Sequence, residues 1–375
     1  MTDYPRLFSP GKIGNRTTIN RFVAQPMEGN DANKGAVSER TLSRYRKLAE
    51  GQWGIIVVEA ISISPDSLAR KDQLVIDRSK LDGYAKLVQE IKTISPDTVV
   101  LFQITHSGRK SGKEFSEPVA AYEPTEGVRL LSADNLRQIQ QDFVESVLLA
   151  QEAGADGVDF KLCHGYLGCE LLRPANLRDD EWGGSFENRT RMLRESVQAI
   201  RDRVKTKDFI LGGRISAYEG IRGGCGTAAA DDIVEDLSEM EDLIRLMISL
   251  EFDYLNVSAG IPGVTSEITR PTIGSRLLYL HQFRYARAAK AVAASMPIIG
   301  SAYTVLKAES LDAAEENLGR GDVDFVGWGR QNLADPHFPA KVRQGFEVDY
   351  CKLCSGCSKF MVEQKPVGCI FFSSH

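Results

Sequence analysis

The 375-residue sequence predicts an α/β fold, a (β/α)8 TIM barrel followed by a short cysteine-rich extension. Eight short apolar runs recur along the chain, and a longer amphipathic stretch follows each of them. The runs are continuously apolar rather than alternating, which is typical of parallel strands that are buried on both faces. Alternation of this kind over eight units favours a closed barrel, with a doubly wound open sheet as the alternative.

The expected elements follow one another in a regular order. The strands are expected over residues 22–27, 54–60, 99–106, 157–162, 209–216, 252–260, 296–302 and 323–330. Helical periodicity is clearest over 136–154 and 187–204, where apolar side chains recur every three or four positions. Residues 38–51 form a further expected helix, capped by Ser38 with Thr41 at its third position.

The sequence divides into a long barrel and a short appendage. We expect residues 1–344 to form the barrel, because all eight strand-helix units lie within them. Residues 345–375 follow the eighth unit and carry four of the seven cysteines. They are expected to be an extension without a core of its own.

Composition and charge exclude several classes of partner. The formal net charge is −5 and no block of basic residues occurs, so neither nucleic acid nor an anionic membrane surface is expected. The N-terminus does not resemble a secretory signal, and no apolar run of about 18 residues occurs, so we expect a cytoplasmic protein without a membrane span. Whether the chain forms a homo-oligomer is left open.

Polar residues collect at the carboxyl ends of the expected strands, where TIM-barrel active sites are built. The fourth strand ends in Lys161, His164 and Tyr166, which offer an ammonium, an imidazole and a phenol. Donors that converge on one point suit a substrate carbonyl, because they stabilise negative charge that develops on its oxygen. For each of the three residues, a purely structural hydrogen bond is the competing interpretation.

Glycine-rich turns follow the seventh and eighth strands. The seventh strand ends in Gly300 and Ala302, and the eighth ends in Gly329 and Arg330. Backbone N–H groups in such turns, next to an arginine, are typical of the phosphate-binding corner of a barrel. Tight turns with a surface arginine are the alternative.

Four cysteines near the C-terminus have the spacing C-x2-C-x2-C-x11-C. They are Cys351, Cys354, Cys357 and Cys369. In a reducing compartment such a group indicates metal or redox chemistry rather than disulfides. Three thiolates in one tight loop with a distant fourth favour a [4Fe-4S] cluster, whereas zinc more often takes two C-x2-C pairs. Zinc and unligated thiols remain alternatives. The other cysteines are expected to be structural: Cys163, Cys169 and Cys225.

The longest motif, HGYLGCELLRPANLRDDEWGGSFENRTRML over residues 164–193, resembles the Old Yellow Enzyme family of FMN-dependent oxidoreductases. Further segments resemble motifs of that family in the same order: NRFVAQPM (20–27), FQITHSGR (102–109), GGRIS (212–216) and GWGRQNLADP (327–336). The resemblance covers essentially the whole chain. It implies a (β/α)8 barrel that binds FMN at its mouth.

The resemblance also implies roles for individual residues. Those implied around the isoalloxazine ring are Pro26, Met27, Glu28, Ala60, Gln103 and Arg214, and those implied around the phosphate are Gly300, Ala302, Gly329 and Arg330. A cation such as Arg214 near N1 of the ring favours the reduced, anionic flavin. Tyr166 matches the proton donor of the family.

Three positions depart from the family pattern. Lys161 stands where the family often has histidine, and Glu28 stands where it often has cysteine or threonine. A carboxylate near the ring disfavours the anionic reduced flavin unless it is protonated or paired, and Lys161 is its expected partner. Trp182 replaces a tyrosine, a change that is expected to be structural.

The cysteine spacing resembles the iron–sulphur branch of the family, which includes 2,4-dienoyl-CoA reductase, trimethylamine dehydrogenase and the bile-acid-inducible oxidoreductases. In that branch further flavin- and nicotinamide-binding domains follow the barrel, whereas no G-x-G-x-x-G fingerprint follows Cys369 here. We therefore expect electrons to come from NAD(P)H directly, or from an external carrier such as ferredoxin or a flavoprotein.

The residues and the resemblance together predict an ene-reductase. Reduced FMN would give a hydride from N5 to the β-carbon of an α,β-unsaturated carbonyl or carboxyl compound. His164 and Lys161 would hold the substrate oxygen, and Tyr166 would protonate the α-carbon. The alternatives are an FMN and iron–sulphur amine dehydrogenase or demethylase, and an electron-transfer subunit of a larger complex.

Overall fold

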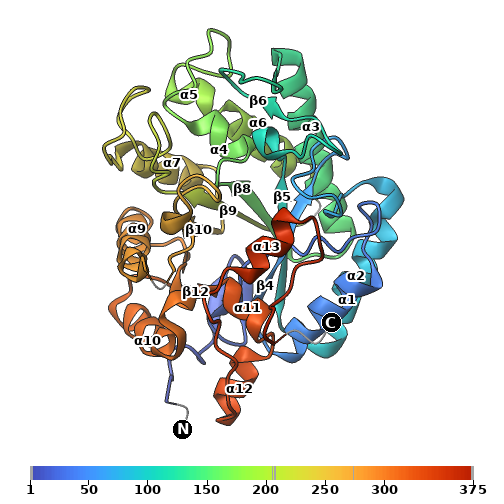
Figure 1. Ribbon diagram of the computed structural model, residues 1–375, viewed down its shortest axis with the longest axis vertical. Coiled ribbons are helices and arrows are strands. Elements are labelled where there is room, and N and C mark those ends of the chain that lie inside the picture. The colour runs from blue at the N-terminus through green and yellow to red at the C-terminus, as the bar shows by residue number, and fades with distance from the viewer. Residues whose placement is uncertain (1–2, 205, 207, 273, 373–375) are drawn as a thin grey trace.

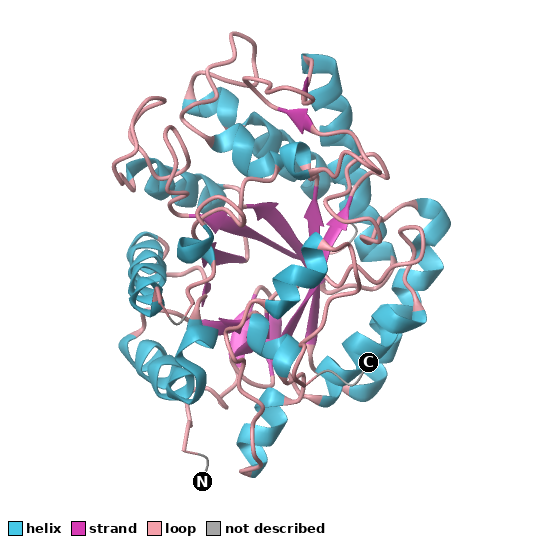
Figure 2. Cartoon of the chain, in the orientation of Figure 1, coloured by secondary structure: helices cyan, strands magenta, loops and turns pink. Residues whose placement is uncertain are grey.

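A computed structural model describes residues 3–204, 206, 208–272 and 274–372 of the chain. Within them, eight parallel strands close into a barrel, so the predicted (β/α)8 fold is confirmed and the open-sheet alternative is wrong (Figure 2). In barrel order the strands are β3 (Phe22–Ala24), β4 (Ile55–Ser62), β5 (Val99–Thr105), β8 (Gly157–Leu162), β9 (Ile210–Ser216), β10 (Tyr254–Ser258), β11 (Ile298–Gly300) and β12 (Phe325–Trp328).

The barrel strands are apolar throughout because both of their faces are covered. Every residue of β4, β5 and β8 is buried. Side chains such as Val23, Val57 and Leu101 fill the barrel interior, and the opposite faces pack against the helices. The hairpin of β1 (Gly11–Ile13) and β2 (Arg16–Thr18) adds Ile13 to the interior cluster. The interior is therefore a packed core, and the space for a ligand lies at the mouth.

Helices surround the barrel in the order that the sequence predicts (Figure 1). The main ones are α1 (Glu39–Glu50), α2 (Leu81–Ile94), α3 (Ala133–Glu152), α6 (Arg191–Arg203), α7 (Ser238–Ser249), α9 (Tyr279–Val292), α10 (Ser310–Arg320) and α12 (Phe338–Gln344). The predicted capping box of α1 is present, since Thr41 N donates to Ser38 Oγ at 3.1 Å and Ser38 N donates to Thr41 Oγ1 at 3.4 Å. The stretch predicted as one helix over 187–204 is two helices, α5 (Phe186–Arg189) and α6, which meet at Thr190.

Several strands end earlier than predicted, and the released residues line the mouth. β3 ends at Ala24, so residues 25–28 leave the ladder as an irregular segment. β11 and β12 are likewise shorter than their predicted ranges. The mouth is thus built from backbone that has just left the sheet.

The C-terminal segment crosses the barrel mouth. In Figure 1, α13 (Gly356–Val362) lies in front of the barrel strands, close to α11 (Arg330–Ala334). Backbone contacts anchor the segment that follows: Val367 N donates to Gly29 O at 2.7 Å, and Asn30 Nδ2 donates to Lys365 O at 3.1 Å. The segment is therefore held to the loop that follows β3. Residues 373–375 of the predicted extension lie outside the described residues.

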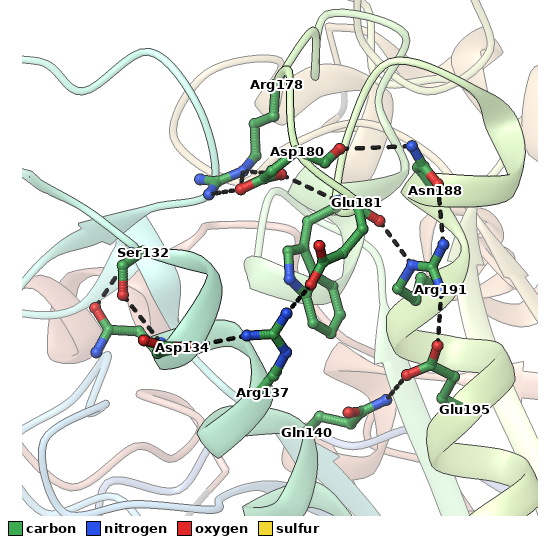
Figure 3. Close-up of polar contacts among 12 residues, drawn as sticks. Ser132, Asp134, Arg137, Gln140, Arg178, Asp180, Glu181, Asn188, Arg191 and Glu195 are labelled. Carbon is green, nitrogen blue, oxygen red and sulfur yellow. Dashed lines mark hydrogen bonds and ion pairs between the residues drawn. The ribbon is translucent and has the colours of Figure 1, made fainter.

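The second half of the longest motif is a surface network rather than part of the mouth (Figure 3). Arg178 pairs with Asp180, whose Oδ1 accepts a hydrogen bond from Trp182 N at 3.0 Å. Arg191 donates to Glu181 O and to Glu195 Oε1, at 2.8 Å each, and so ties the loop to α6. Trp182 is 1% exposed beneath this network, in agreement with its expected structural role.

None of the helices in the described ranges is both long enough and apolar enough to cross a lipid bilayer.

Candidate active site at the barrel mouth

A cavity of about 290 Å³ lies at the carboxyl ends of the barrel strands. Ser358, Met361 and Val362 from α13 complete its lining. The lining residues that the sequence predicts are Pro26, Met27, Glu28, Gln103, Lys161, His164, Tyr166, Arg214, Ala302, Gly329 and Arg330. Ala60 and Gly300 are buried in β4 and β11 and do not line the cavity. A larger cavity of about 520 Å³ lies between α1 and the C-terminal segment, but it lacks the donor residues of β8.

Glu28 is the centre of a buried ionic network. Its Oε1 accepts hydrogen bonds from Tyr166 Oη at 2.5 Å and from Lys161 Nζ at 3.2 Å, and its Oε2 lies 3.1 Å from Arg70 Nε. Burial alone raises the pKa of Glu28, but the charges of Arg70 and Lys161 outweigh burial and lower the pKa to about 2. Glu28 is therefore an anion, and Lys161 is one of its partners.

Tyr166 is held as a neutral phenol. Its ring lies under the Lys161 ammonium, with Nζ 3.3 Å from the ring centroid. Burial and the negative charge of Glu28 raise the pKa of Tyr166 well above its usual value. The Tyr166 hydroxyl donates a hydrogen bond to Glu28, so this hydrogen bond must break before the phenol can donate to another group.

The turn after β8 needs left-handed backbone. His164 and Gly165 have φ angles of 62° and 71°, which turn the chain from β8 into α4 (Leu167–Leu172) and place Tyr166 at its N-cap. His164 N donates to Ser216 Oγ at 3.0 Å, and its Nε2 lies 2.8 Å from Ser258 Oγ. Burial and the charge of Arg214 lower the pKa of His164 well below its usual value, so the imidazole is neutral.

Two arginines of the cavity, the buried Arg330 and the half-buried Arg214, each keep an unused donor. Arg214 donates to Gln25 Oε1 at 3.1 Å, and Arg330 donates to Pro271 O at 2.8 Å. Arg214 Nε and Arg330 Nη1 are buried and have no hydrogen-bond partner among the described residues. An unsatisfied buried donor is costly, so both guanidinium groups suit an anionic ligand that spans the mouth. This pattern fits FMN, which carries a phosphate at one end and ring carbonyls at the other.

The four clustered thiols lie behind this corner of the mouth. Cys351 and Cys369 are buried in one small apolar cluster with Leu306. Leu353 and Ser355 have φ angles of 57° and 58°, and these left-handed residues curl the loop. Gly356 N donates to Cys354 Sγ at 3.4 Å.

The spacing of these thiols does not match a single metal ion. Among the described residues, no three of the four sulphurs lie within 4.8 Å of one another. Tetrahedral zinc, with Zn–S near 2.3 Å, would require separations of roughly 3.8 Å. Burial raises the pKa values of Cys351 and Cys357, and the charge of Arg330 opposes both shifts. The charge of Arg330, which lines the cavity, therefore also acts on two of the thiols.

One other group of candidate metal ligands gathers beside α4. Cys169 Sγ and Cys225 Sγ are 3.8 Å apart, and Cys169 Sγ lies 3.2 Å from Glu219 Oε1. Arg173 donates to both oxygens of Glu219, at 2.7 and 3.0 Å. The charge of Glu219 is thus already balanced by a buried arginine, so we interpret the group as structural.

Sequence reasoning missed three cations of the cavity. Arg70, Lys110 and Arg270 line it, although none of them lies at the end of a predicted strand. Arg109, the last residue of the FQITHSGR motif, does not line the cavity and pairs with Glu170 at 2.6 Å. Lys110 directly follows the FQITHSGR motif, which was the only local signal for it.

Comparison with known proteins decides the family. The family described as NADH:flavin oxidoreductase / NADH oxidase matches residues 6–349. The chain belongs to this family. The resemblance to the Old Yellow Enzyme family that the sequence motifs indicate is thereby confirmed.

Individual members of the family differ in length. An NADH oxidase of Thermoanaerobacter brockii is 30% identical over 99% of this chain, but the chain spans only 54% of that relative. An NADPH dehydrogenase of Clostridium acetobutylicum is also 30% identical, and the match covers 89% of this chain and 93% of the relative. The chain thus matches both a relative about twice as long and one of about its own length.

Solved structures show the same fold. A 2-naphthoyl-CoA reductase complex has a TM-score of 0.84 at 24% identity, and the match covers 98% of this chain and 56% of that chain. A morphinone reductase in complex with tetrahydroNAD has a TM-score of 0.71 at 20% identity, covering 92% of each chain.

Proposed function

We propose that the protein is an ene-reductase that reduces the carbon–carbon double bond of an α,β-unsaturated carbonyl or carboxyl compound. The observation that carries this proposal is the grouping of Lys161, His164 and Tyr166 on one cavity. Arg214 and Arg330 also line this cavity, and each keeps a buried donor without a hydrogen-bond partner among the described residues. Bound FMN would supply the hydride, from N5 to the β-carbon. The protein would supply the orientation, the charge stabilisation and the proton.

We propose that the mouth residues hold FMN as the resemblance implies. Pro26, Met27 and Ala60 would contact the ring through their backbones, Gln103 would face its pyrimidine edge, and Arg214 would lie near N1. The proposed phosphate residues are Gly300, Ala302, Gly329 and Arg330. Support comes from Ala302, whose φ of 75° shapes the turn after β11, and from the unused donor of Arg330.

The substrate oxygen would be held by His164 and Lys161. An ammonium has three donors, and the described contacts of Lys161 use one of them on Glu28, so others can reach a carbonyl. The neutral imidazole of His164 can donate one N–H without adding a charge. Donors held in place before the reaction stabilise the charge that develops on the oxygen at little reorganisation cost.

Tyr166 would protonate the α-carbon after releasing Glu28. Its hydroxyl donates to Glu28 in the described state, so the proton must turn from the carboxylate to the substrate. The phenolate left behind would be stabilised by Lys161 over its ring and by the nearby charge of Arg70. Glu28 would thus accept the hydrogen bond of the phenol before the reaction, and Lys161 and Arg70 would stabilise the phenolate after it.

Replacing Tyr166 by phenylalanine tests this assignment. Because a positioned general acid contributes about 10²- to 10⁴-fold, Tyr166→Phe should slow alkene reduction by about that factor. The rate of flavin reduction by NAD(P)H should stay unchanged, since that step needs no proton from Tyr166. Stopped-flow absorbance separates the two half-reactions, and equal loss in both would contradict the role.

We further propose that residues 345–375 are a cluster-binding extension, in which Cys351, Cys354, Cys357 and Cys369 hold a [4Fe-4S] cluster. Support comes from the C-x2-C-x2-C-x11-C spacing of the four cysteines in the sequence and from the curled loop that carries three of them. Iron and labile-sulphide analysis of anaerobically purified protein tests this. Stoichiometric zinc, or no metal, would contradict it.

The cavity disfavours the amine dehydrogenase alternative. Six cationic side chains line it and only one carboxylate does, that of Glu28. A cationic amine would add another positive charge to this group. We therefore retain the ene-reductase as the proposed function.

A further inference from the structure

The charges of the cavity do not balance within the protein. The cations that line it are Arg70, Lys110, Lys161, Arg214, Arg270 and Arg330. Glu28 offsets one of these six charges. A buried excess of positive charge is costly unless an anion neutralises it. The positive charge that the protein leaves unbalanced therefore indicates that the cavity binds anionic ligands.

Bound FMN would account for three more of the charges. Arg270 and Arg330 lie close enough together for their charges to interact, and a phosphate with about two negative charges near pH 7 would offset both. Arg214, at the predicted position of N1, would offset the charge of the reduced ring. Two positive charges then remain, one on Lys110 and one shared by Arg70 and Lys161 around Glu28.

The loops that carry Arg70 and Lys110 are fastened to each other. Ser107 N donates to Ser67 Oγ at 2.6 Å, and Ser107 Oγ donates to Ser67 O at 2.8 Å. Gly112 N also donates to Leu68 O at 2.8 Å. These three bonds join the loop after β4 to the loop after β5, and so hold two cations on one wall of the cavity.

Lys110 lies beside the proposed catalytic donors. A Cβ atom placed on Gly165, between His164 and Tyr166, would be 3.5 Å from Lys110 Cε. The Lys110 ammonium donates to Pro262 O at 3.2 Å, and among the described residues it forms no salt bridge with a carboxylate. The Arg173 guanidinium nearby is already balanced by Glu219. Lys110 therefore lines the cavity without a salt-bridge partner among these residues. Burial and the charge of Arg173 lower its pKa, so an anionic ligand beside it would favour its charged form.

We propose that the enzyme acts on an anionic substrate, one that carries a carboxylate at or beside the activated alkene, and that Lys110 and Arg70 bind this carboxylate. The inference rests on the proposed ene-reductase function and narrows its substrate class. Lys110 can approach the carboxylate as a point charge. Arg70 pairs with Glu28 by charge without a hydrogen bond, and its one hydrogen bond that the structure describes runs from Nη1 to Ala69 O, so guanidinium donors remain for the carboxylate. The carboxylate would complete the charge balance on the wall next to Tyr166.

A binding measurement separates recognition from reactivity. The FMN-loaded enzyme is titrated with 3-phenylpropanoate and with its methyl ester, neither of which can be reduced, and calorimetry gives both dissociation constants. The acid should bind at least about 10-fold more tightly than the ester, because only the acid carries the countercharge. Equal affinities, or tighter binding of the ester, would overturn the proposal even without any variant.

Variants assign the effect to a residue. Lys110→Met should remove most of the preference for the acid and leave the affinity for the ester unchanged, whereas Lys110→Arg should retain the preference. Lys113→Met is the matched control, because Lys113 is an exposed lysine of the same loop that does not line the cavity. The same effect from Lys110→Met and Lys113→Met would assign no role to Lys110. FMN content, read from the visible spectrum, shows that each variant is loaded.

A turnover assay distinguishes failure of this inference from failure of the proposed function. The neutral probe is cinnamaldehyde and the anionic probe is cinnamate, each supplied to the reduced enzyme under anaerobic conditions. Reduction of an activated alkene with no preference for acids in binding would overturn the inference and leave the ene-reductase intact. Tight binding of acids with no reduction of either probe would overturn the proposed function and leave the anion site intact.

Discussion

At the residue scale, the carboxylate of Glu28 orients the side chains around it. Lys161, Tyr166 and Arg70 all contact its carboxylate, so the charge of one residue sets the orientation of two proposed catalytic groups. Glu28 is therefore ionised and paired with Lys161 and Arg70 rather than protonated, since its pKa falls to about 2.

This pairing predicts a pH-dependent stability. The folded pKa of Glu28 is about 2 against a usual value of 4.5, so its ionisation stabilises the fold by about 3 kcal/mol above pH 4.5. That contribution is lost as the pH falls through 4.5 towards 2, because the unfolded state then binds the proton first. In urea unfolding of the FMN-free protein, the stability difference between wild type and Glu28→Gln should narrow by about 1 kcal/mol from pH 7 to pH 3.5. A difference that stays constant over this range would contradict the depressed pKa.

Arg330 gives a second prediction at this scale. If its unused Nη1 donor binds the FMN phosphate, Arg330→Met should weaken FMN binding by about 10- to 100-fold, as expected for one charge-assisted hydrogen bond. Fluorescence titration of the FMN-free protein measures this. Arg343→Met is the control, because Arg343 is exposed and stacks on Phe8 away from the cavity.

At the element scale, the turn from β8 into α4 is the critical piece of backbone. His164 and Gly165 are both left-handed, and the turn brings Tyr166 back over the strand end. A Cβ atom on Gly165 would lie 3.1 Å from both Arg173 Nη2 and Ile261 Cγ2. The position therefore requires glycine for its conformation and for its close neighbours.

Gly165→Ala should destabilise the protein by about 1–2 kcal/mol through the left-handed backbone alone, with a further cost from the crowding. Gly321→Ala is a matched control, because Gly321, at the C-cap of α10, has a φ of 72° with nothing within 4 Å of its Cβ position and does not line the cavity. Urea unfolding should therefore show the larger loss for Gly165→Ala, and alkene reduction should fall in that variant alone. Equal losses of stability would show that crowding at Gly165 has no effect.

At the scale of the whole molecule, the cysteine-bearing segment and the barrel mouth form one assembly. α13 lines the cavity, and Arg270 Nη1 donates to Ser358 Oγ at 2.5 Å, which ties the loop after β10 to α13. A cluster bound by the four thiols would therefore hold one wall of the active site in place. It would also lie behind Arg330, on the phosphate side of the proposed flavin.

Loss of the cluster should loosen this wall. Cys357→Ser should lower the iron content and should speed hydrogen exchange of residues 350–372, while the barrel strands keep their protection. Hydrogen exchange with mass spectrometry measures both regions in one experiment. Unchanged exchange of the segment in an iron-depleted variant would show that the cluster does not hold it.

The route of electrons is a further prediction at this scale. If NAD(P)H reduces the flavin directly at the mouth, stopped-flow mixing with NADH or NADPH should bleach the flavin in the cluster-depleted variant as in wild type. If electrons arrive through the cluster, a reduced one-electron carrier such as ferredoxin should reduce wild type only. The two outcomes distinguish the proposed donors.

Local sequence pattern by itself determined the fold, the family and the order of the strands, but not where β3, β11 and β12 end. Continuous apolar runs mark strands that are buried on both faces, and Lys161, His164 and Tyr166 adjoin one such run, so a short window of sequence is enough to place them. Only the tertiary structure decided that Glu28 binds Tyr166 and that Arg70 lies beside Lys110. These residues come from different loops that meet when the barrel closes, and no periodicity along the chain records how loops pack. The excess of positive charge in the cavity, from which we infer an anionic substrate, therefore arises only in the folded protein and cannot be predicted from any one segment of the sequence.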